Sequence, residues 1–167
     1  FEAQEQELKL ETVDFRQLIE EILASMRLQF EKYRATVQWT ADDSNCTLTG
    51  DRLHLASVVY NLIDNALKYS PDRPQINITL KHVDMGLQLT VSDQGLGIPA
   101  AYRHKIFEKF FRVPSGDVHN VKGHGLGLSY VAGVIKQHQG TITVDSVEGR
   151  GTTFLVYLPM QQDTTKL

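Results

Sequence analysis

The alternation of two hydrophobic periods along the chain is the feature that most constrains its fold. In three segments apolar residues recur every three or four positions, whereas apolar and polar residues alternate in the segments between them. The helical period predicts helices over 14–33, 51–69 and 125–138, with Asp14 and Asp51 placed to cap the first two. Helices interleaved with strand pairs indicate an α/β two-layer sandwich, a mixed and mostly antiparallel sheet of about five strands with three main helices on one face.

The segments of alternating residues predict short strands joined by turns. The expected strands cover 8–13, 35–40, 46–49, 75–83, 87–92, 141–146 and 152–158. Pro71 and Pro74 stop the second helix, and Gly140 stops the third. We therefore expect one domain over residues 8–160, followed by a polar tail at 161–167.

One long stretch, residues 94–124, shows little periodicity except for a helical turn or two over 100–107. A run of this length without regular structure inside a compact domain is usually functional and often a lid. Ten of the twelve glycines follow residue 94, so unusual backbone conformations are concentrated in this part of the chain. We expect a flexible lid over about 99–124.

Composition excludes several classes of protein. The 167 residues carry 17 Lys and Arg against 20 Asp and Glu, a net charge of −3, which argues against nucleic-acid binding through a basic face. Cys46 is the only cysteine, so a disulfide framework and a cysteine metal cluster are excluded. No apolar run approaches the roughly 18 residues that cross a bilayer, and we expect no signal peptide.

An unusual polar stripe runs along the second expected helix. Ser57, Asn61, Asn65 and Lys68 follow steps of four, four and three residues and therefore share one face. Asparagine is a poor helix former, and exposed helix faces usually carry Glu, Lys or Gln instead. A solvated face is one interpretation. The other is a cradle whose amide oxygens bind a hard cation while its ammonium binds phosphate.

Three motifs containing glycine follow, and each is ambiguous by itself. Asp93 precedes glycines at alternate positions in 93–97, which suits a carboxylate beside a flat ligand or an ordinary turn. Residues 122–128 place glycines where a helix begins and its N–H groups favour an anion. Their spacing is neither a Rossmann nor a Walker motif. Residues 149–154 alone indicate a hairpin rich in glycine.

Together, the order and spacing of these motifs resemble the ATP-binding catalytic domain of sensor histidine kinases. Those kinases belong to the superfamily that also holds type II topoisomerases, a heat-shock chaperone and mismatch-repair ATPases. Residues 61–69 resemble its N box, 93–97 its G1 box, 106–112 its F box, 122–128 its G2 box and 149–154 its last glycine box. The resemblance covers about Leu8 to Pro159 and implies the Bergerat fold, with ATP and Mg²⁺ as cofactors.

The resemblance also implies roles for individual residues. Asn61 would supply an amide oxygen to magnesium, while Asn65 and Lys68 would contact phosphates. Asp93 would accept a hydrogen bond from the 6-amino group of adenine. Asn61, Lys68 and Arg112 are the expected catalytic residues, and Asn61 is the expected metal ligand. The expected nucleotide-binding residues are Asn61, Asn65, Lys68, Tyr69, Asp93, Gly95, Gly97, Ile98, Lys122, Gly123, His124, Gly125, Leu126, Gly127, Leu128 and Thr152.

Two positions depart from the pattern of the family. Relatives that hydrolyse ATP carry a glutamate one turn before the first N-box asparagine, where this chain has Ser57, so we expect weak intrinsic ATPase activity. The G2 box usually begins with two glycines, and Lys122 replaces the first.

None of the six histidines directly precedes Glu or Asp, as the phosphoacceptor of the family usually does. His119 and His124 lack a third ligand for a metal site.

The resemblance implies a protein-histidine kinase domain that transfers the γ-phosphoryl group of Mg-ATP to a histidine on a dimerisation domain outside this chain. The phosphoryl group would then pass to an aspartate of a response regulator. The expected partners are ATP or ADP, that dimerisation domain and the response regulator, with no nucleic acid. Residues 1–7 would be the end of the upstream dimerisation segment.

Further expectations concern the parent protein and the alternatives. The full-length protein would be a homodimeric inner-membrane sensor, with this domain in the cytoplasm and monomeric when isolated. One alternative is a stand-alone ATPase or a serine kinase of the anti-sigma type, which a phosphate-release assay would reveal. Another is a pseudokinase that serves as an interaction module, which calorimetry with ATP or ADP would reveal.

Overall fold

The computed structural model describes residues 7–42, 44–109, 111 and 127–162. Helices and strands alternate along the chain much as the hydrophobic periods predict. The elements are β1 (Glu11–Asp14), α1 (Phe15–Ser25), α2 (Arg27–Tyr33), β2 (Thr36–Ala41), β3 (Thr47–Gly50), α3 (Arg52–Lys68), β4 (Gln75–Val83), β5 (Gly86–Asp93), the 3-10 helix η2 (Ala100–Tyr102), α4 (Gly127–Gln137), β6 (Thr141–Val147) and β7 (Gly151–Pro159).

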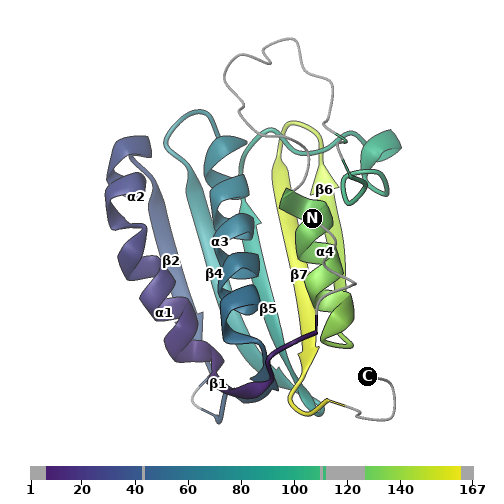
Figure 1. Ribbon diagram of the computed structural model, residues 1–167. Helices are drawn as coiled ribbons and strands as arrows, with labels where there is room; N and C mark the ends of the chain where they lie inside the picture. The colour runs from purple at the N-terminus through teal and green to yellow at the C-terminus, as the bar shows by residue number, and fades with distance from the viewer. Residues whose placement is uncertain (1–6, 43, 110, 112–126, 163–167) are drawn as a thin grey trace.

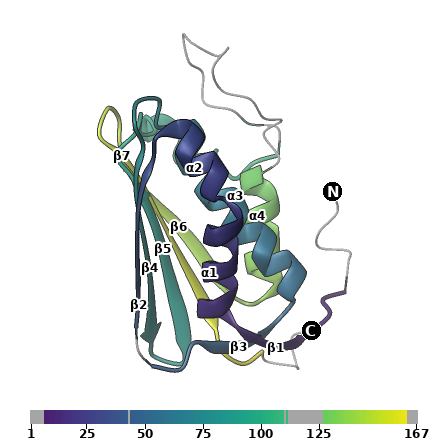
Figure 2. The same cartoon turned by 90° about the vertical axis from the view of Figure 1, so that its left-hand side faces the viewer.

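The main sheet has five strands in the order β2-β4-β5-β7-β6. Strands β2 and β4 are parallel, and the other neighbouring pairs of this sheet are antiparallel. The α-helices cover one face of the sheet, and α3 lies between α1 and α4 (Figure 1, Figure 2). The expected α/β two-layer sandwich with a mixed, mostly antiparallel five-stranded sheet is therefore confirmed.

The hydrophobic core lies between the inner face of the sheet and the helices α1, α3 and α4. The buried stripe of α3 has helical spacing and consists of Leu55, Val58, Val59, Leu62, Ile63, Ala66 and Leu67. The strands contribute alternate residues, which are Ile76, Ile78, Leu80, Leu87, Leu89, Val91, Phe154, Val156 and Leu158. Burial of this apolar surface fixes α3 on the sheet and thereby orients the polar residues on its other face.

Within the described residues, no helix is both long enough and apolar enough to span a membrane.

The first expected helix is wrong in one respect, because residues 14–33 form two helices rather than one. Helix α1 ends at Ser25, α2 begins two residues later, and Met26 between them has φ −94° and ψ 4°. The Ser25 hydroxyl donates to the Ile22 carbonyl oxygen at 2.7 Å. A serine that bonds back to its own helix competes with the backbone hydrogen bonds and bends the helix. The sandwich therefore has α1 and α2 where one helix was expected.

The expected helix caps are confirmed. Asp14 caps α1 by accepting from the Gln17 N–H at 3.1 Å, and Asp51 caps α3 by accepting from the His54 N–H at 3.1 Å. The strand expected at 8–13 is the shorter β1, which pairs with β3 in a separate two-stranded sheet. The small sheet closes one end of the sandwich, where the chain enters α1 and α3.

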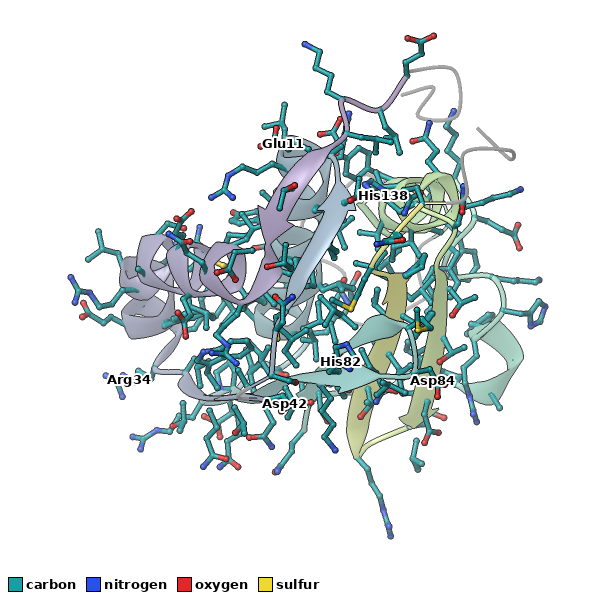
Figure 3. All side chains as sticks on the ribbon, turned by 90° about the horizontal axis from the view of Figure 1, so that it is seen from below. Glu11, Arg34, Asp42, His82, Asp84 and His138 are labelled. Carbon is teal, nitrogen blue, oxygen red and sulfur yellow. The ribbon has the colours of Figure 1, made fainter. Side chains whose placement is uncertain are left out.

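A buried junction at the base of the molecule joins α3, α4 and the segment before β1. Figure 3 labels its histidine, His138. The Nε2 atom of His138 accepts from the Asp51 N–H at 3.0 Å, and its Nδ1 atom donates to the Val134 carbonyl oxygen at 2.8 Å. The Asp51 carboxylate also accepts from the Lys9 N–H at 2.9 Å. Burial lowers the pKa of His138, so its imidazole is neutral with the proton on Nδ1. The junction holds the N-terminal end of α3 against the C-terminal end of α4.

Candidate functional site

A pocket lies between the C-terminal end of α3, the loop after β5 and the start of α4. It is lined by Asn65, Tyr69, Asp93, Gly97, Ile98, Ile106, Phe111, Leu128 and Thr152. All of these except Ile106 and Phe111 belong to the expected nucleotide-binding residues. The pocket encloses about 60 Å³, whereas a typical small-molecule site has roughly 300–1,000 Å³. The described residues therefore enclose only part of a ligand of nucleotide size.

Asp93 is the only acidic residue among the described residues that line this pocket. It ends β5 opposite Thr152 of β7 and is 7% exposed. Its Oδ1 atom accepts from the Gly95 N–H at 2.8 Å. Burial raises the pKa of Asp93, and the N–H groups of Gly95 and Thr152 and the nearby Ser70 hydroxyl lower it by less. A carboxyl group is thus held, with its charged form disfavoured, at the wall of the pocket.

Two glycines allow the loop after β5 to lie against its neighbours. A Cβ atom on Gly95 would lie 2.2 Å from the carbonyl oxygen of Tyr69, which accepts from the Leu96 N–H at 2.9 Å. Gly97 has φ +72°, and a Cβ atom there would lie 2.2 Å from the carbonyl oxygen of Val147. Larger residues would separate these backbones. The loop therefore contacts the end of α3 on one side and the end of β6 on the other.

The sequence alone does not mark every residue that builds the pocket. The Ile98 N–H donates to the buried Ser146 hydroxyl at 2.8 Å, and this hydroxyl donates to the Gly151 carbonyl oxygen at 2.7 Å. No local pattern marks Ser146, because its partner lies in a distant part of the chain. Ile106 and Phe111 lie inside the motif that resembles the F box, so the sequence marks their segment but not their place in the pocket wall.

The asparagines of the polar stripe face the pocket side of α3. Asn61 Nδ2 donates to the Ser57 carbonyl oxygen at 2.7 Å, which turns the Oδ1 atom away from its own helix. A Cβ atom on Gly127 would lie 3.2 Å from that Oδ1 atom, while Asn65 lines the pocket itself. An amide oxygen presented in this way fits Mg²⁺, which takes oxygen ligands and keeps several waters. In the described part of the chain, no cluster of three or more His, Cys, Asp or Glu residues could hold a metal.

Lys68 is not among the residues that line the pocket. Its Nζ atom lies 2.8 Å from Oδ2 of Asp64, and both side chains are partly buried. The hydrogen bond with Asp64 raises the pKa of Lys68, so the ammonium is charged at neutral pH. The expected contact of Lys68 with phosphate stays a prediction.

The position one turn before Asn61 holds a hydroxyl group. Ser57 Oγ donates to the Leu53 carbonyl oxygen at 3.2 Å. Tyr130 of α4 lies close to Ser57, and its hydroxyl is 2.7 Å from Nδ1 of His54. Burial raises the pKa of Tyr130, so its phenol is neutral. A serine hydroxyl bonded to its own helix is a poor general base for the activation of water.

Part of the expected site falls outside the described residues. These positions are Arg112, Lys122, Gly123, His124, Gly125 and Leu126. The first described residues after them are Gly127 and Leu128, which begin α4. The lid expected over 99–124 is described only through residue 109 and at 111, a segment that starts with η2.

Known proteins have sequences similar to this chain. The family model for histidine kinase-, DNA gyrase B-, and HSP90-like ATPases matches residues 50–162. Sensor protein RprX of Bacteroides fragilis (strain YCH46) is 34% identical over 162 residues, which are 96% of this chain and 31% of RprX. The chain thus spans about a third of the length of this curated relative.

Solved structures share the fold. The catalytic domain of histidine kinase ThkA has a TM-score of 0.81 at 25% identity, and the match covers 92% of this chain and 99% of that one. The mycobacterial sensor histidine kinase MprB has a TM-score of 0.77 at 32% identity over 92% of this chain and 99% of that one. ThkA in complex with response regulator protein TrrA has a TM-score of 0.76 at 23% identity, over 90% of this chain and 42% of that one. The chain therefore belongs to the family of histidine kinase-, DNA gyrase B-, and HSP90-like ATPases, as an ATP-binding catalytic domain of the sensor histidine kinase type.

Proposed function

We propose that this domain binds Mg-ATP in the pocket beside α3 and presents the γ-phosphoryl group to a histidine on a dimerisation domain of the same protein. Membership of the family supports ATP binding, and relatives named as sensor proteins or histidine kinases support the transfer. Phosphoryl transfer requires positioning and neutralisation of charge more than covalent chemistry from the protein. The asparagines and the lysine on the polar face of α3 are residue types that can position a phosphate chain and neutralise its charge.

In this proposal the two ends of the nucleotide meet different residues. Asp93 accepts from the 6-amino group of adenine, and Tyr69 and Thr152 complete the base site around the loop of Gly95 and Gly97. Gly127 and Leu128 lie where the start of α4 would meet the nucleotide. These assignments agree with the lining of the pocket, in which Tyr69, Asp93 and Thr152 lie together.

At the phosphate end, Asn65 and Lys68 bind phosphate oxygens and the Asn61 Oδ1 atom binds magnesium. The cation would neutralise charge on the phosphate chain when bound. Arg112 and residues 122–126 are proposed to act here as well, although they lie outside the described residues. Asn61, Lys68 and Arg112 remain the proposed catalytic residues.

The single observation that carries the proposal is the buried carboxyl group of Asp93 in the pocket wall. Burial raises the pKa of this group and disfavours its charged form. Carboxyl groups with a pKa shifted in this way are typical of functional sites. One carboxylate oxygen accepts from the Gly95 N–H, so the loop backbone fixes the orientation of the group. A carboxylate held in this way can read the amino group of a base.

The change Asp93→Asn tests this assignment. The variant keeps the shape of the side chain but can place an amide NH₂ where the base amino group needs an acceptor. The affinity for Mg-ATP in calorimetry should fall about ten- to a hundred-fold, or about 1.5–3 kcal/mol. Asp145→Asn, an equal change of charge at an exposed position of β6, is the matched control. Wild-type affinity in the Asp93→Asn variant would contradict the assignment.

Transfer to histidine is tested separately in the full-length protein. Incubation with ATP labelled at the γ-phosphate should label a histidine outside residues 1–167, and the label should pass to an aspartate of a response regulator. The structure of ThkA with response regulator protein TrrA supports this class of partner. A full-length protein that binds ATP but acquires no acid-labile phosphate would exclude the transfer and leave nucleotide binding intact.

A stand-alone ATPase or a serine kinase of the anti-sigma type is not favoured by the relatives. Ser57, bonded to its own helix, also lacks the basicity needed to activate water. Fast release of phosphate by this domain alone would support the ATPase instead.

We also propose the domain limits and the setting of the parent protein. The catalytic domain would occupy residues 8–160, between a dimerisation segment ending in 1–7 and a polar tail at 161–167. The name of the relative RprX, a sensor protein, supports a sensor as the parent protein. We propose that this sensor is homodimeric and lies in the inner membrane, with this domain on the cytoplasmic side. Fractionation and cross-linking of the full-length protein would test both points.

A further inference from the structure

Asp64 and Lys68 form an ion pair next to the polar stripe, and the proposed function leaves Asp64 without a role. The Nζ and Oδ2 atoms are 2.8 Å apart, and the side chains of Lys68 and Asp64 are 32% and 21% exposed. Asp64 follows Tyr60 by four residues along α3, so the side chains of Asp64 and Tyr60 lie on the same side of this helix. Tyr33 ends α2, and the Tyr60 hydroxyl accepts from Gln29 of α2 at 3.2 Å. The ammonium of Lys68 therefore lies on the side of α3 that faces α2.

The geometry of α3 gives this ammonium a second position. Lys68 follows Asp64 by four residues and Asn61 by seven, so its Cα atom projects between those of Asp64 and Asn61 around the helix axis. Lysine carries its charge on a flexible stem of four carbons. The ammonium can therefore reach the Asp64 carboxylate on one side of α3 or the asparagine face on the other.

We propose that Asp64 competes with the nucleotide phosphates for Lys68 and thereby sets the affinity of the domain for the phosphate chain. The inference rests on the proposed function, in which phosphates lie along the asparagine face. When phosphates bind, Lys68 exchanges one anionic partner for another, so the lost ion pair offsets part of the new contact. Asp64 is thus a positioning residue that acts through Lys68.

The variant Asp64→Asn tests the proposal, because it removes the competing charge and keeps the shape of the side chain. Calorimetry at low ionic strength should show about two- to five-fold tighter binding of Mg-ATP, the scale of a partly exposed ion pair. Adenosine, which lacks phosphates, should bind as it does to the wild type. The gain for ATP should shrink as salt is added.

Glu21→Gln is the matched control. Glu21 forms a 2.7 Å ion pair with Arg52 at the opposite end of α3, and the two side chains are about half exposed. The control variant therefore loses one negative charge and one ion pair of an α3 residue, as Asp64→Asn does, but away from the pocket. Its affinity for ATP should equal that of the wild type.

A variant without Lys68 separates competition for this lysine from simple repulsion between the Asp64 carboxylate and the phosphates. In a Lys68→Met variant, Asp64→Asn should no longer tighten ATP binding, because the shared cation is gone. A gain that persists in that background, an equal gain for adenosine, or unchanged or weaker ATP binding by Asp64→Asn alone would overturn the inference. A wild-type domain that binds no ATP would instead overturn the proposed function.

Discussion

Asp93 is the residue at which stability and ligand recognition make opposite demands. Burial raises its pKa above the ordinary value of the unfolded chain, so the folded protein binds a proton more readily than the unfolded protein does. The carboxylate therefore costs stability above the pKa of the folded state, and this cost disappears as the pH falls through that pKa. The cost is acceptable if the acceptor serves a ligand, as we propose.

Asp93→Asn should accordingly stabilise the free domain while it weakens ATP binding. At pH 7 the free energy of unfolding should rise by on the order of 1 kcal/mol, because a neutral amide replaces a buried carboxylate. Urea unfolding from pH 7 to pH 4 should show the two proteins converging as Asp93 takes up its proton. A wild-type domain more stable than the variant at pH 7 would show that the carboxylate stabilises the fold.

At the scale of elements, α3 organises the site. Its apolar stripe, its Asp51 cap and its polar face are local patterns, so the sequence alone predicts the helix and the residues that it presents. At the break at Met26, a single serine side chain bonds back to its own helix, and the pairing of β1 with β3 joins distant segments. The spacing of apolar residues predicts neither the helix break nor this strand pairing.

In the pocket, too, local patterns can be predicted from the sequence, whereas contacts between distant segments cannot. Local motifs single out Asn65 and Asp93, the resemblance to a family adds Tyr69, and the structure brings the three residues together. The register of β5 and β7 places Thr152 opposite Asp93, and only the resemblance to a family anticipates that pair. Ser146 holds the Ile98 backbone across a long stretch of sequence, and nothing local could reveal it.

The cap of α3 should matter more than the cap of α1. Asp51 is 5% exposed and its carboxylate accepts from both Lys9 and His54, whereas the exposed Asp14 accepts from Gln17. Asp51→Ala should therefore lower the free energy of unfolding by about 2 kcal/mol or more, since it removes the acceptor of two partly buried N–H groups. Asp14→Ala is the control and should cost about 1 kcal/mol or less in the same urea titration. Equal costs would contradict the importance of the buried junction.

At the scale of the whole molecule, the buried junction lies at the opposite ends of α3 and α4 from the pocket. His138 is 1% exposed and accepts from Asp51 through Nε2. Protonation of that atom would turn the acceptor into a donor and place a charge in a buried site. Stability should therefore depend on the protonation state of this one imidazole.

The pKa of His138 is lowered in the folded protein, so its contribution to stability is complete above the ordinary histidine pKa of about 6.5. Below that pH the unfolded chain binds the proton first, and the free energy of unfolding should fall by up to about 1.4 kcal/mol per pH unit. Urea unfolding between pH 7 and pH 5 measures the slope. His138→Gln, which retains an acceptor for the Asp51 N–H, should lose this component of the slope. An identical pH dependence in both proteins would show that other groups cause it.

The central claim, that Asp93 reads the amino group of adenine, is tested most directly by comparing ATP with purine riboside triphosphate, which lacks that group. Calorimetry with magnesium should show the wild-type domain binding ATP about ten-fold more tightly or better. The Asp93→Asn variant should bind the two nucleotides about equally. Equal affinities in the wild type, or a preference for ATP that survives in the variant, would contradict the account.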